Sequence, residues 1–467
     1  TQIVMIFIIK TLRGLIIPFI LAPQSYALWA TIGVLLGYLR YADLGVHASL
    51  AKRLPVFLAN DDRDSYQKMI GLGLSWNLVI GMLLTIGLVA ASFLYKGENQ
   101  HFYQPALLIL AVTIVFQNIR ALCNEIIRSR CDYKGVSMQS IIGDVASFIA
   151  AVVGVIFFGE LGLVASILVG EVFGLGYCII RLIDLGFDDI RLYLQGLTSV
   201  IREGLLLLLV GFIEMIMMTL DQIFLINFYD NSEYGLYAFG LFIVSMLIAM
   251  SMIFVTHQPY ILRLADLGRK KECASLLEAN LVLYLTIIAI CTPLMFFAID
   301  LLLNYYLKEY QPGLMLYILM PIIALARTPV VILRGYFIAY HQEKSLIRWQ
   351  LSGLMLMLIL NFLIIDWSLS YEWFIASICA GYGLTGGLMF RKFYADNSQI
   401  GNYYRYMIYI ILLVLGSYGI HQLNNIYLQL ELTEFISSLL IFFIETILFI
   451  GLVFWKKGLW MSSLALF

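Results

Sequence analysis

The sequence predicts an all-α polytopic membrane protein of about fourteen transmembrane helices, arranged as two parallel six-helix lobes followed by two C-terminal helices. Composition is the first reason, because 62% of the 467 residues are apolar and only 13% are charged, which is far from a soluble globular protein. Nearly all of the chain also divides into apolar runs of about 18–28 residues, each long enough to cross a bilayer. Finally, lysine and arginine gather in alternate loops, as expected of a chain that crosses the membrane repeatedly.

The apolar runs define the expected spans. In order they are 2–22, 26–50, 69–95, 104–125, 136–158, 161–185, 201–228, 233–258, 277–304, 312–337, 346–366, 371–391, 403–423 and 432–455. One set of alternate loops, together with the C-terminal tail, holds Lys52, Arg53, Arg63, Lys68, Arg128, Arg130, Lys134, Arg191, Arg263, Arg269, Lys270, Lys271, Lys344, Arg391, Lys392, Lys456 and Lys457. The opposite set holds only Lys96 and Lys308. This asymmetry predicts that both termini lie in the cytoplasm.

An internal repeat predicts the domain organisation. Residues 11–30 align without gaps on residues 219–238 with five identities, and each copy covers a first helix, a short link and the start of a second helix. The copies lie six spans apart, so they have the same orientation in the membrane. We therefore expect an N-lobe at 1–185, an amphipathic linker at 186–200, a C-lobe at 201–391 and two further spans within 392–467.

Charged residues inside the first two spans are the strongest indication of function. Lys10 and Arg13 share one helical face, and Arg40, Asp43 and His47 follow each other at spacings of three and four. A cation at the bilayer centre costs about 2.5–3.5 kcal/mol on insertion scales, so such a residue normally faces a wet cavity or a partner. The alternative is structural: an internal ion pair such as Arg40–Asp43, or snorkelling to the interface, which we favour for Arg120, Glu125 and Arg334.

The expected C-lobe carries charges of the opposite sign in its first helix. Glu214 and Asp221 lie seven residues apart there, and Arg327 lies in the tenth span. A cationic N-lobe wall suits a phosphate, because the planar fork of arginine binds it bidentately. The acidic groups suit a titratable or cation-coupled site. The ion-coupling candidates are Asp43, His47, Glu214 and Asp221, although a lone intramembrane histidine is more often structural.

Several classes of function are disfavoured. The six cysteines form no CxxC pair, so neither a disulfide framework nor a metal site is expected. No phosphate-cradling nucleotide loop is present, so we expect no ATP hydrolysis and no cofactor. A membrane glycosyltransferase or polymerase would need substantial outward loops, and the outward loops here are short. The protein is therefore not expected to be an enzyme or to bind nucleic acid.

The link and the second span resemble a known family. They resemble the Wzx-type flippases of bacterial polysaccharide synthesis, within the superfamily that includes multidrug and toxin extruders and lipid II flippases. That family has a Gly-Pro-x-x-Tyr-Gly-Leu-Trp link, then Asp-Leu-Gly, then a basic residue. The matching residues here are Pro23, Tyr26, Leu28, Trp29, Asp43, Leu44, Gly45 and Arg53. Ala22 and Ala27 replace the usual glycines.

The resemblance implies a specific activity. The protein would move undecaprenyl-pyrophosphate-linked oligosaccharide, such as an O-antigen repeat unit, from the cytoplasmic to the outer face of the bacterial plasma membrane. It would do so by alternating access of the two lobes, coupled to a proton or sodium gradient. Arg13, Arg40, Lys10 and Arg327 would hold the pyrophosphate. Partners would be the lipid-linked oligosaccharide and membrane lipids, with the polysaccharide polymerase and chain-length machinery as further candidates.

Two alternatives belong to the same superfamily. A lipid II flippase would share the span count and the cationic cavity, and the Tyr-x-Leu-Trp link and the Asp-Leu-Gly signature favour the polysaccharide branch over it. A cation-coupled drug antiporter would favour an acidic and apolar N-lobe pocket, whereas the first span here carries Lys10 and Arg13.

Overall fold

The computed structural model describes residues 2–184, 192–193, 195–250 and 258–397. All the regular structure of this part is helical, which confirms the predicted fold class. Nine of its helices are long and apolar enough to cross a membrane, namely α4, α5, α6, α7, α8, α9, α14, α15 and α16. The chain is therefore a multi-pass membrane protein. The predicted spans 403–423 and 432–455 lie outside the described residues, so the total of about fourteen stays a prediction.

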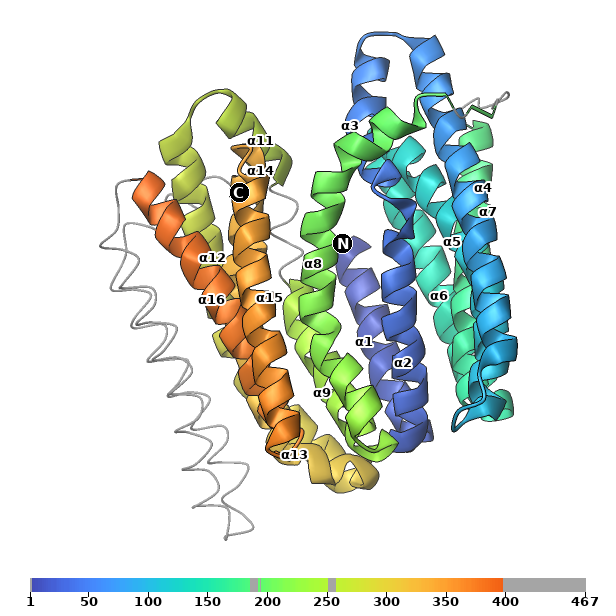
Figure 1. Ribbon diagram of the computed structural model, residues 1–467, viewed down its shortest axis with the longest axis vertical. Helices are drawn as coiled ribbons and strands as arrows, with labels where there is room; N and C mark the ends of the chain where they lie inside the picture. The colour runs from blue at the N-terminus through green and yellow to red at the C-terminus, as the bar shows by residue number, and fades with distance from the viewer. Residues whose placement is uncertain (1, 185–191, 194, 251–257, 398–467) are drawn as a thin grey trace. The chain divides into compact units, whose positions relative to one another are not determined.

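The helices follow the predicted order of spans (Figure 1). Their bounds are α1 Gln2–Ile20, α2 Pro23–Leu39, η1 Arg40–Asp43, α3 Val46–Ala59, α4 Arg63–Leu94, α5 Gln100–Ser129, α6 Tyr133–Phe158, α7 Glu160–Asp184, α8 Leu197–Phe228, α9 Asn231–Met250, α11 Gln258–Asp266, α12 Lys270–Tyr305, η2 Lys308–Gly313, α13 Leu314–Leu319, α14 Pro321–Ala339, α15 Glu343–Asp366 and α16 Trp373–Asp396.

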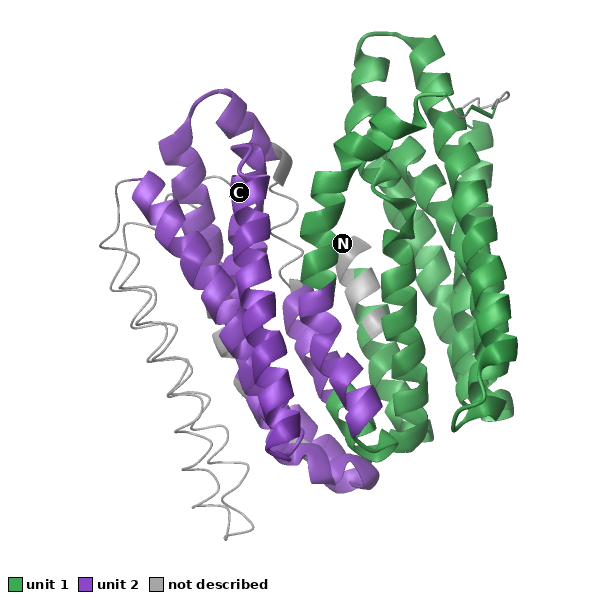
Figure 2. Cartoon of the chain, in the orientation of Figure 1, with its two compact units in different colours: residues 1–215, 229–238 green, residues 216–228, 239–467 purple. Residues whose placement is uncertain are grey.

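The chain forms two compact units (Figure 2). Unit 1 comprises Thr1–Met215 and Tyr229–Ala238, and unit 2 comprises Ile216–Phe228 and Phe239–Phe467. The division passes through α8 and α9 rather than through a loop. Four residues of the predicted linker at 186–200 belong to the start of α8, which begins at Leu197. The lobe borders drawn from the sequence stay a prediction.

The prediction of one continuous span at 26–50 is wrong. The chain leaves α2 after Leu39, makes the 3-10 turn η1 and enters α3 at Val46. Leu44 and Gly45 between them are left-handed, with φ of 53° and 84°, and two consecutive left-handed residues interrupt an α-helix. Glycine adopts this conformation without steric cost. The Asp-Leu-Gly signature is therefore a helix break.

Helix boundaries support the internal repeat. The sequence alignment carries Ile20 onto Phe228 and Pro23 onto Asn231. The structure ends α1 at Ile20 and begins α2 at Pro23, and it ends α8 at Phe228 and begins α9 at Asn231. The two copies therefore turn from one helix into the next at equivalent residues.

Five turns between helices repeat one backbone geometry in the described part of the chain. A left-handed residue follows the first helix in each, namely Asp61, Cys131, Gly268, His341 and Ser368. The next residue donates its N–H to a carbonyl five residues earlier, as in Asp62 to Phe57, Asp132 to Ile127, Arg269 to Leu264, Gln342 to Phe337 and Leu369 to Ile364. This is the Schellman arrangement, which satisfies carbonyls at a helix end. The turns occur in both units, and this supports an architecture built from repeated helix hairpins.

Close helix packing in both units depends on small residues. A Cβ added at Gly170 of α7 would lie 2.9 Å from the carbonyl oxygen of Gly143 on α6. In unit 2, a Cβ at Gly353 of α15 would lie 2.5 Å from the carbonyl oxygen of Gly381 on α16. Such contacts allow backbones to approach closely, which is how helices associate where lipid removes the hydrophobic driving force.

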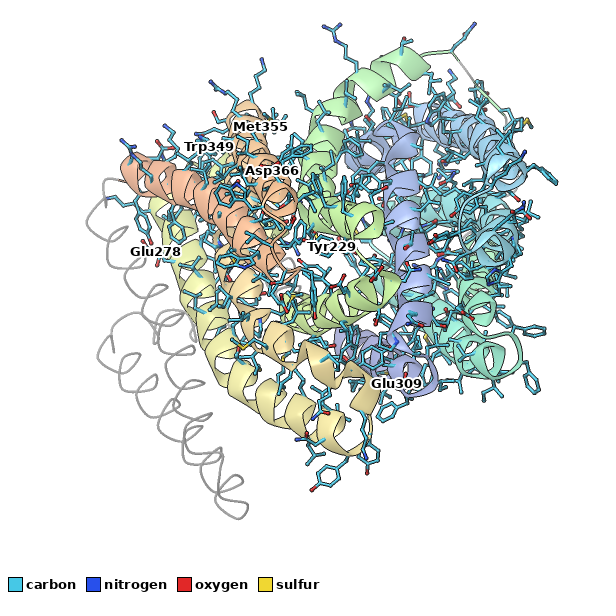
Figure 3. All side chains as sticks on the ribbon, turned by 60° about the horizontal axis from the view of Figure 1, so that its bottom comes forward. Tyr229, Glu278, Glu309, Trp349, Met355 and Asp366 are labelled. Atoms are coloured by element: carbon cyan, nitrogen blue, oxygen red, sulfur yellow. The ribbon has the colours of Figure 1, made fainter. Side chains whose placement is uncertain are left out.

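Individual helices separate an inner from an outer face. On α15, along which Figure 3 labels Trp349, Met355 and Asp366, the side chain of Met355 is 54% exposed whereas Gln350 is fully buried. On α4, Ile86 is 60% exposed and Phe93 is 71% exposed. Exposed apolar faces of this kind are expected where a helix meets lipid rather than water.

Candidate functional site

Arg13 is held by hydroxyl groups in the interior of unit 1. Its Nη1 donates to Oγ of Ser147 on α6 at 2.7 Å, and its Nη2 donates to Oγ of Ser166 on α7 at 3.1 Å. Both serines are buried. The Arg13 Cζ lies 6.0 Å from the ring centroid of Trp29, within range of a cation–π contact. Asp144 of α6 is close enough for its charge to act on Arg13.

Arg40 is exposed and faces an amide. It begins η1, and its guanidinium meets the side chain of Gln117 on α5. With the amide oriented so that its oxygen faces the guanidinium, this oxygen accepts from Nε at 2.5 Å and from Nη2 at 3.2 Å. Among the described residues Arg40 makes no ion pair within 4 Å. The structure therefore contains no Arg40–Asp43 ion pair, which was the structural alternative.

Asp43 instead holds the helix break together. Its Oδ1 accepts from the backbone N–H of Gly45 at 3.2 Å, and its Oδ2 accepts from the N–H of His47 at 3.0 Å. The ring of His47 places Nδ1 3.0 Å from the same Oδ2 and Nε2 3.2 Å from Nδ2 of Asn77. Trp76 donates its indole N–H to the Asp43 carbonyl at 2.8 Å. Asp43 and His47, two predicted coupling residues, therefore form one hydrogen-bonded group.

Arg120 has an acidic partner. Its Nη1 lies 3.0 Å from Oε2 of Glu171 on α7, and its Nε donates to Gln139 at 2.8 Å. Two glycines make room for it, because a Cβ at Gly143 would lie 3.2 Å from Nη1 and a Cβ at Gly174 would lie 2.9 Å from Nε. The prediction of an internal ion pair is confirmed for Arg120. It is also confirmed for Glu125, which pairs with Arg128 at 3.1 Å.

The remaining predicted site residues are distributed over both units. Glu214 is buried in the part of α8 that belongs to unit 1, whereas Asp221 is fully buried in the part that belongs to unit 2. Arg327 is buried in unit 2, with its Cζ 5.8 Å from the ring centroid of Tyr382. The side chain of Lys10 lies outside the described side chains. The structure therefore brings Arg13, Arg40, Asp43, His47 and Glu214 into one unit.

Sequence reasoning missed the groups that contact these arginines, namely Gln117, Ser147, Ser166 and Glu171. Serine and glutamine carry no charge, so a search for charged residues in apolar spans passes over them. Glu171 and the nearby Asp144 are charged and lie in predicted spans, but they form no charge stripe with a neighbour on their own helix. One signal was available: Gly143 and Ser147 on α6, and Gly170 and Gly174 on α7, are pairs of small residues four apart, a spacing typical of close helix contacts.

Arginine and carboxylate side chains lie close together in this part of unit 1. Arg13, Arg40 and Arg120 contribute three positive charges, and Asp144 and Glu171 contribute two negative charges. Glu171 lies close enough to Arg120 and Arg40 for both charges to act on it. No group of three or more metal-ligating side chains occurs among the described residues. Of the three arginines, Arg13 and Arg40 are the two that are held by uncharged groups.

Comparison with known proteins gives the fold. No family model and no curated protein matches the chain. Among solved structures, the inward-facing conformation of a multidrug resistance MATE family transporter of the MOP superfamily matches with a TM-score of 0.66 and 12% identity, over 85% of this chain and 96% of that one. The lipid II flippase MurJ, in an inward closed conformation, matches with a TM-score of 0.63 and 11% identity, over 97% and 99% of the two chains. This is the fold of MOP-superfamily transporters.

A third MOP-superfamily structure also matches the chain. It is a transporter from Pyrococcus furiosus, with a TM-score of 0.59 and 12% identity over 86% of this chain and 96% of that one. Its description states that the reverse polarity of its binding pocket suggests a different function. At 12% identity this likeness bears on the fold alone.

Proposed function

We propose that this protein is a flippase that moves a polyprenyl-pyrophosphate-linked oligosaccharide across a bacterial plasma membrane. The observation that carries the proposal is the way Arg13 and Arg40 are held. Neutral hydroxyls bind the first and a neutral amide binds the second. These partners orient the guanidinium without neutralising its charge, so each arginine can still bind an anion.

The neighbouring Arg120 gives an internal comparison. Glu171 neutralises it at 3.0 Å within the same unit. An ionised group in an apolar bundle is costly unless it is paired. Keeping Arg13 without a bonded acid inside the bundle is therefore best explained if the substrate supplies the negative charge, and the exposed Arg40 is open to the same anion. A pyrophosphate suits this role, because its oxygens accept two parallel hydrogen bonds from one guanidinium.

Energy for export is proposed to come from an ion gradient. Asp43 and His47 lie three and seven residues after Arg40, and the Nδ1 atom of His47 is 3.0 Å from Oδ2 of Asp43. Glu214 and Asp221 are further buried acids that could bind a proton or a sodium ion. We propose alternating access without ATP hydrolysis or enzymatic chemistry, both termini in the cytoplasm, and the polysaccharide polymerase and chain-length machinery as partners.

Lipid II is the main alternative substrate. The match to MurJ covers 97% of this chain, against 85% and 86% for the MATE transporters. Lipid II also carries a polyprenyl pyrophosphate, so the same arginines would bind it, and the two substrates differ in their sugars. A drug antiporter is less favoured, because cationic drugs would be repelled by Arg13 and Arg40, which are held by uncharged groups.

Native mass spectrometry of the purified protein tests the proposal. The unmodified protein and the Arg13→Ala/Arg40→Ala variant are purified from the native host, and the bound lipids are identified by mass. We expect a polyprenyl-pyrophosphate oligosaccharide with the unmodified protein and at least about tenfold less with the variant, since hydrogen bonds to a charged group contribute about 1.5–3 kcal/mol each.

The matched control is Arg63→Ala/Arg348→Ala, which removes two exposed arginines near the starts of α4 and α15. It should retain the lipid. Lipid II in the spectrum would assign the protein to cell-wall synthesis. If bulk phospholipid alone is found with the unmodified protein and with both variants, the pyrophosphate proposal is wrong and the antiporter becomes the better hypothesis.

A further inference from the structure

Arg13 and Arg40 lie at different depths in unit 1. Helices α1 and α2 are joined by a short turn (Figure 1). Arg13 precedes the end of α1 at Ile20 by seven residues, which places it about 10 Å from this turn at 1.5 Å per residue. Arg40 follows the 17 residues of α2 that begin at Pro23, so it lies about 26 Å from the same turn.

The partners of each arginine give the same two depths. The α4–α5 and α6–α7 links lie at the end of unit 1 that contains the α1–α2 turn (Figure 1). Counted from this end, Gln117 lies about 26 Å along α5, Ser147 about 17 Å along α6 and Ser166 about 9 Å along α7. The guanidinium of Arg40 is therefore separated from that of Arg13 by roughly 10–15 Å along the helix axes.

This separation is too large for one phosphate group to touch both guanidiniums, because a hydrogen bond to guanidinium nitrogen requires about 2.7–3.2 Å. A phosphate group bound to Arg40 would therefore not contact Arg13, and one bound to Arg13 would not contact Arg40.

The region between the two arginines carries negative as well as positive charge. Arg120 touches Gly143 and Gly174, which lie about 22 Å along α6 and about 21 Å along α7 from the same end. Its partner Glu171 neutralises it. Asp144 follows Gly143 directly, and its charge acts on both Arg13 and Glu171. An anion at this depth would therefore meet an arginine that is already paired with Glu171, with the charge of Asp144 nearby.

We propose that unit 1 binds the pyrophosphate at two successive stations. The first station is Arg40 with Gln117, and the second is Arg13 with Ser147 and Ser166; Arg120, Glu171 and Asp144 separate them and keep the anion from being held between. This rests on the proposed function for the identity of the anion. Two separated sites of moderate strength allow a charged substrate to enter and to leave, whereas one continuous cationic site would trap it.

Binding and transport together test the two stations. Farnesyl pyrophosphate is titrated into the detergent-solubilised full chain by calorimetry, for the unmodified protein, Arg13→Gln, Arg40→Gln and the double variant. If either station can bind the anion, the stronger one supplies at least about half of the total binding constant. At least one single variant should then stay within about twofold of the unmodified affinity, and the double variant should bind at least about tenfold more weakly.

Transport should respond differently from binding. Both single variants should lose export of the lipid-linked oligosaccharide in cells, because the anion has to pass both stations. Arg63→Gln is the control and should change neither measurement. Thermal unfolding confirms that each variant is folded. If an arginine variant does not fold, Gln117→Glu and Ser147→Asp neutralise the same two arginines in place.

The outcomes separate the two-station inference from the pyrophosphate proposal on which it rests. If both single variants lose more than about twofold in affinity, the two arginines share one site, which overturns the two stations and leaves pyrophosphate recognition intact. If a single variant still transports, its arginine is not an obligatory station, which also overturns this inference. If the double variant binds as well as the unmodified protein, or if the latter does not bind farnesyl pyrophosphate, both this inference and the pyrophosphate proposal fail.

Discussion

At the scale of single residues, the partner of an arginine decides its role. Arg120 has a carboxylate at 3.0 Å and stabilises the contact between α5 and α7. Arg13 and Arg40 have hydroxyl and amide partners. Removing the acid from a buried ion pair leaves an uncompensated charge, whereas these two sites are built without one. The same side chain thus has a charged partner at one position and uncharged partners at another.

Gln117→Glu tests this distinction. The substitution puts a carboxylate against Arg40 in place of the amide, so we expect export to be lost while the thermal unfolding temperature stays equal or rises, because an ion pair replaces a hydrogen bond from the guanidinium to an uncharged amide. Growth or glycan export in cells and thermal unfolding in detergent are the measurements. Gln100→Glu, the same change at the exposed start of α5, should keep export. Full activity of Gln117→Glu would contradict a role for the charge of Arg40.

Asp43→Ala tests the function of the Asp-Leu-Gly signature. The carboxylate accepts two backbone N–H groups at the start of α3, and loss of such a cap costs about 0.5–2 kcal/mol. We expect a lower thermal unfolding temperature for Asp43→Ala and a much smaller change for Asp43→Asn, which retains a cap oxygen. Equal losses in both variants would indicate that the negative charge of Asp43, rather than the cap, stabilises this segment.

At the scale of elements, the break between α2 and α3 positions Arg40. The left-handed Leu44 and Gly45 end the helical path of the second span. A Cβ at Gly45 would lie 2.6 Å from the backbone carbon of Gly204 on α8. Residue 45 is therefore a glycine for two reasons: its φ angle is left-handed, and α8 leaves no room for a Cβ. The break and its contact with α8 fix the start of α3 within unit 1.

The turn between α5 and α6 contains an ion pair that should give a pH-dependent stability. Asp132 accepts from Nε of Arg181 at 2.7 Å and from the N–H of Gly135 at 3.0 Å, and these bonds, Arg181 first, lower the pKa of Asp132. Its ordinary value is about 3.9. The stabilisation is therefore complete above about pH 4 and is lost as the pH falls through the lowered pKa.

Asp132→Asn isolates this effect. The amide retains the cap to Gly135 and loses the ion pair, so its unfolding temperature should be below that of the unmodified protein at pH 7, and the gap should close towards pH 3. Thermal unfolding in detergent at both pH values measures it. A gap of equal size at pH 3 would mean that the ionised carboxylate is not the stabilising group.

At the scale of the whole molecule, the two units repeat one scheme of helix hairpins. The same left-handed turn occurs at Asp61, Cys131, Gly268, His341 and Ser368, and the α1–α2 and α8–α9 links match residue for residue. The repeat keeps the fold while the charges diverge: Arg13 lies in the first copy, and Asp221 lies in the second. A repeated scaffold with different interior charges is suited to binding an anion in one part and a coupling cation in another.

Cysteine labelling tests the orientation of this scaffold. Cys131 is exposed in the α5–α6 turn, and Glu98 is exposed in the α4–α5 link. With a membrane-impermeant maleimide, we expect label on Glu98→Cys in intact cells, in a Cys131→Ser background. Native Cys131 should be labelled only after permeabilisation, because basic turns stay in the cytoplasm. The reverse pattern would invert the proposed topology.

The sequence by itself determined the all-helical membrane fold, the order of the described helices and the positions of the intramembrane charges. It could do so because span length, composition and the distribution of lysine and arginine are local properties set by the bilayer. It also contained the repeat and its turn, since both copies are continuous segments.

Only the tertiary structure decided which charges are neutralised and at what depth each one lies. Gln117, Ser147, Ser166 and Glu171 come from three helices that are remote in sequence from Arg13 and Arg40, and spacing along one helix says nothing about contacts between helices. Gln117 and Glu171 both lie in long apolar helices, yet the first leaves the charge of Arg40 in place and the second neutralises Arg120. The sequence also did not predict the helix break at Leu44 and Gly45. An apolar run indicates that a segment lies in lipid, but the path of its backbone depends on the hydrogen bonds that Asp43 makes after folding.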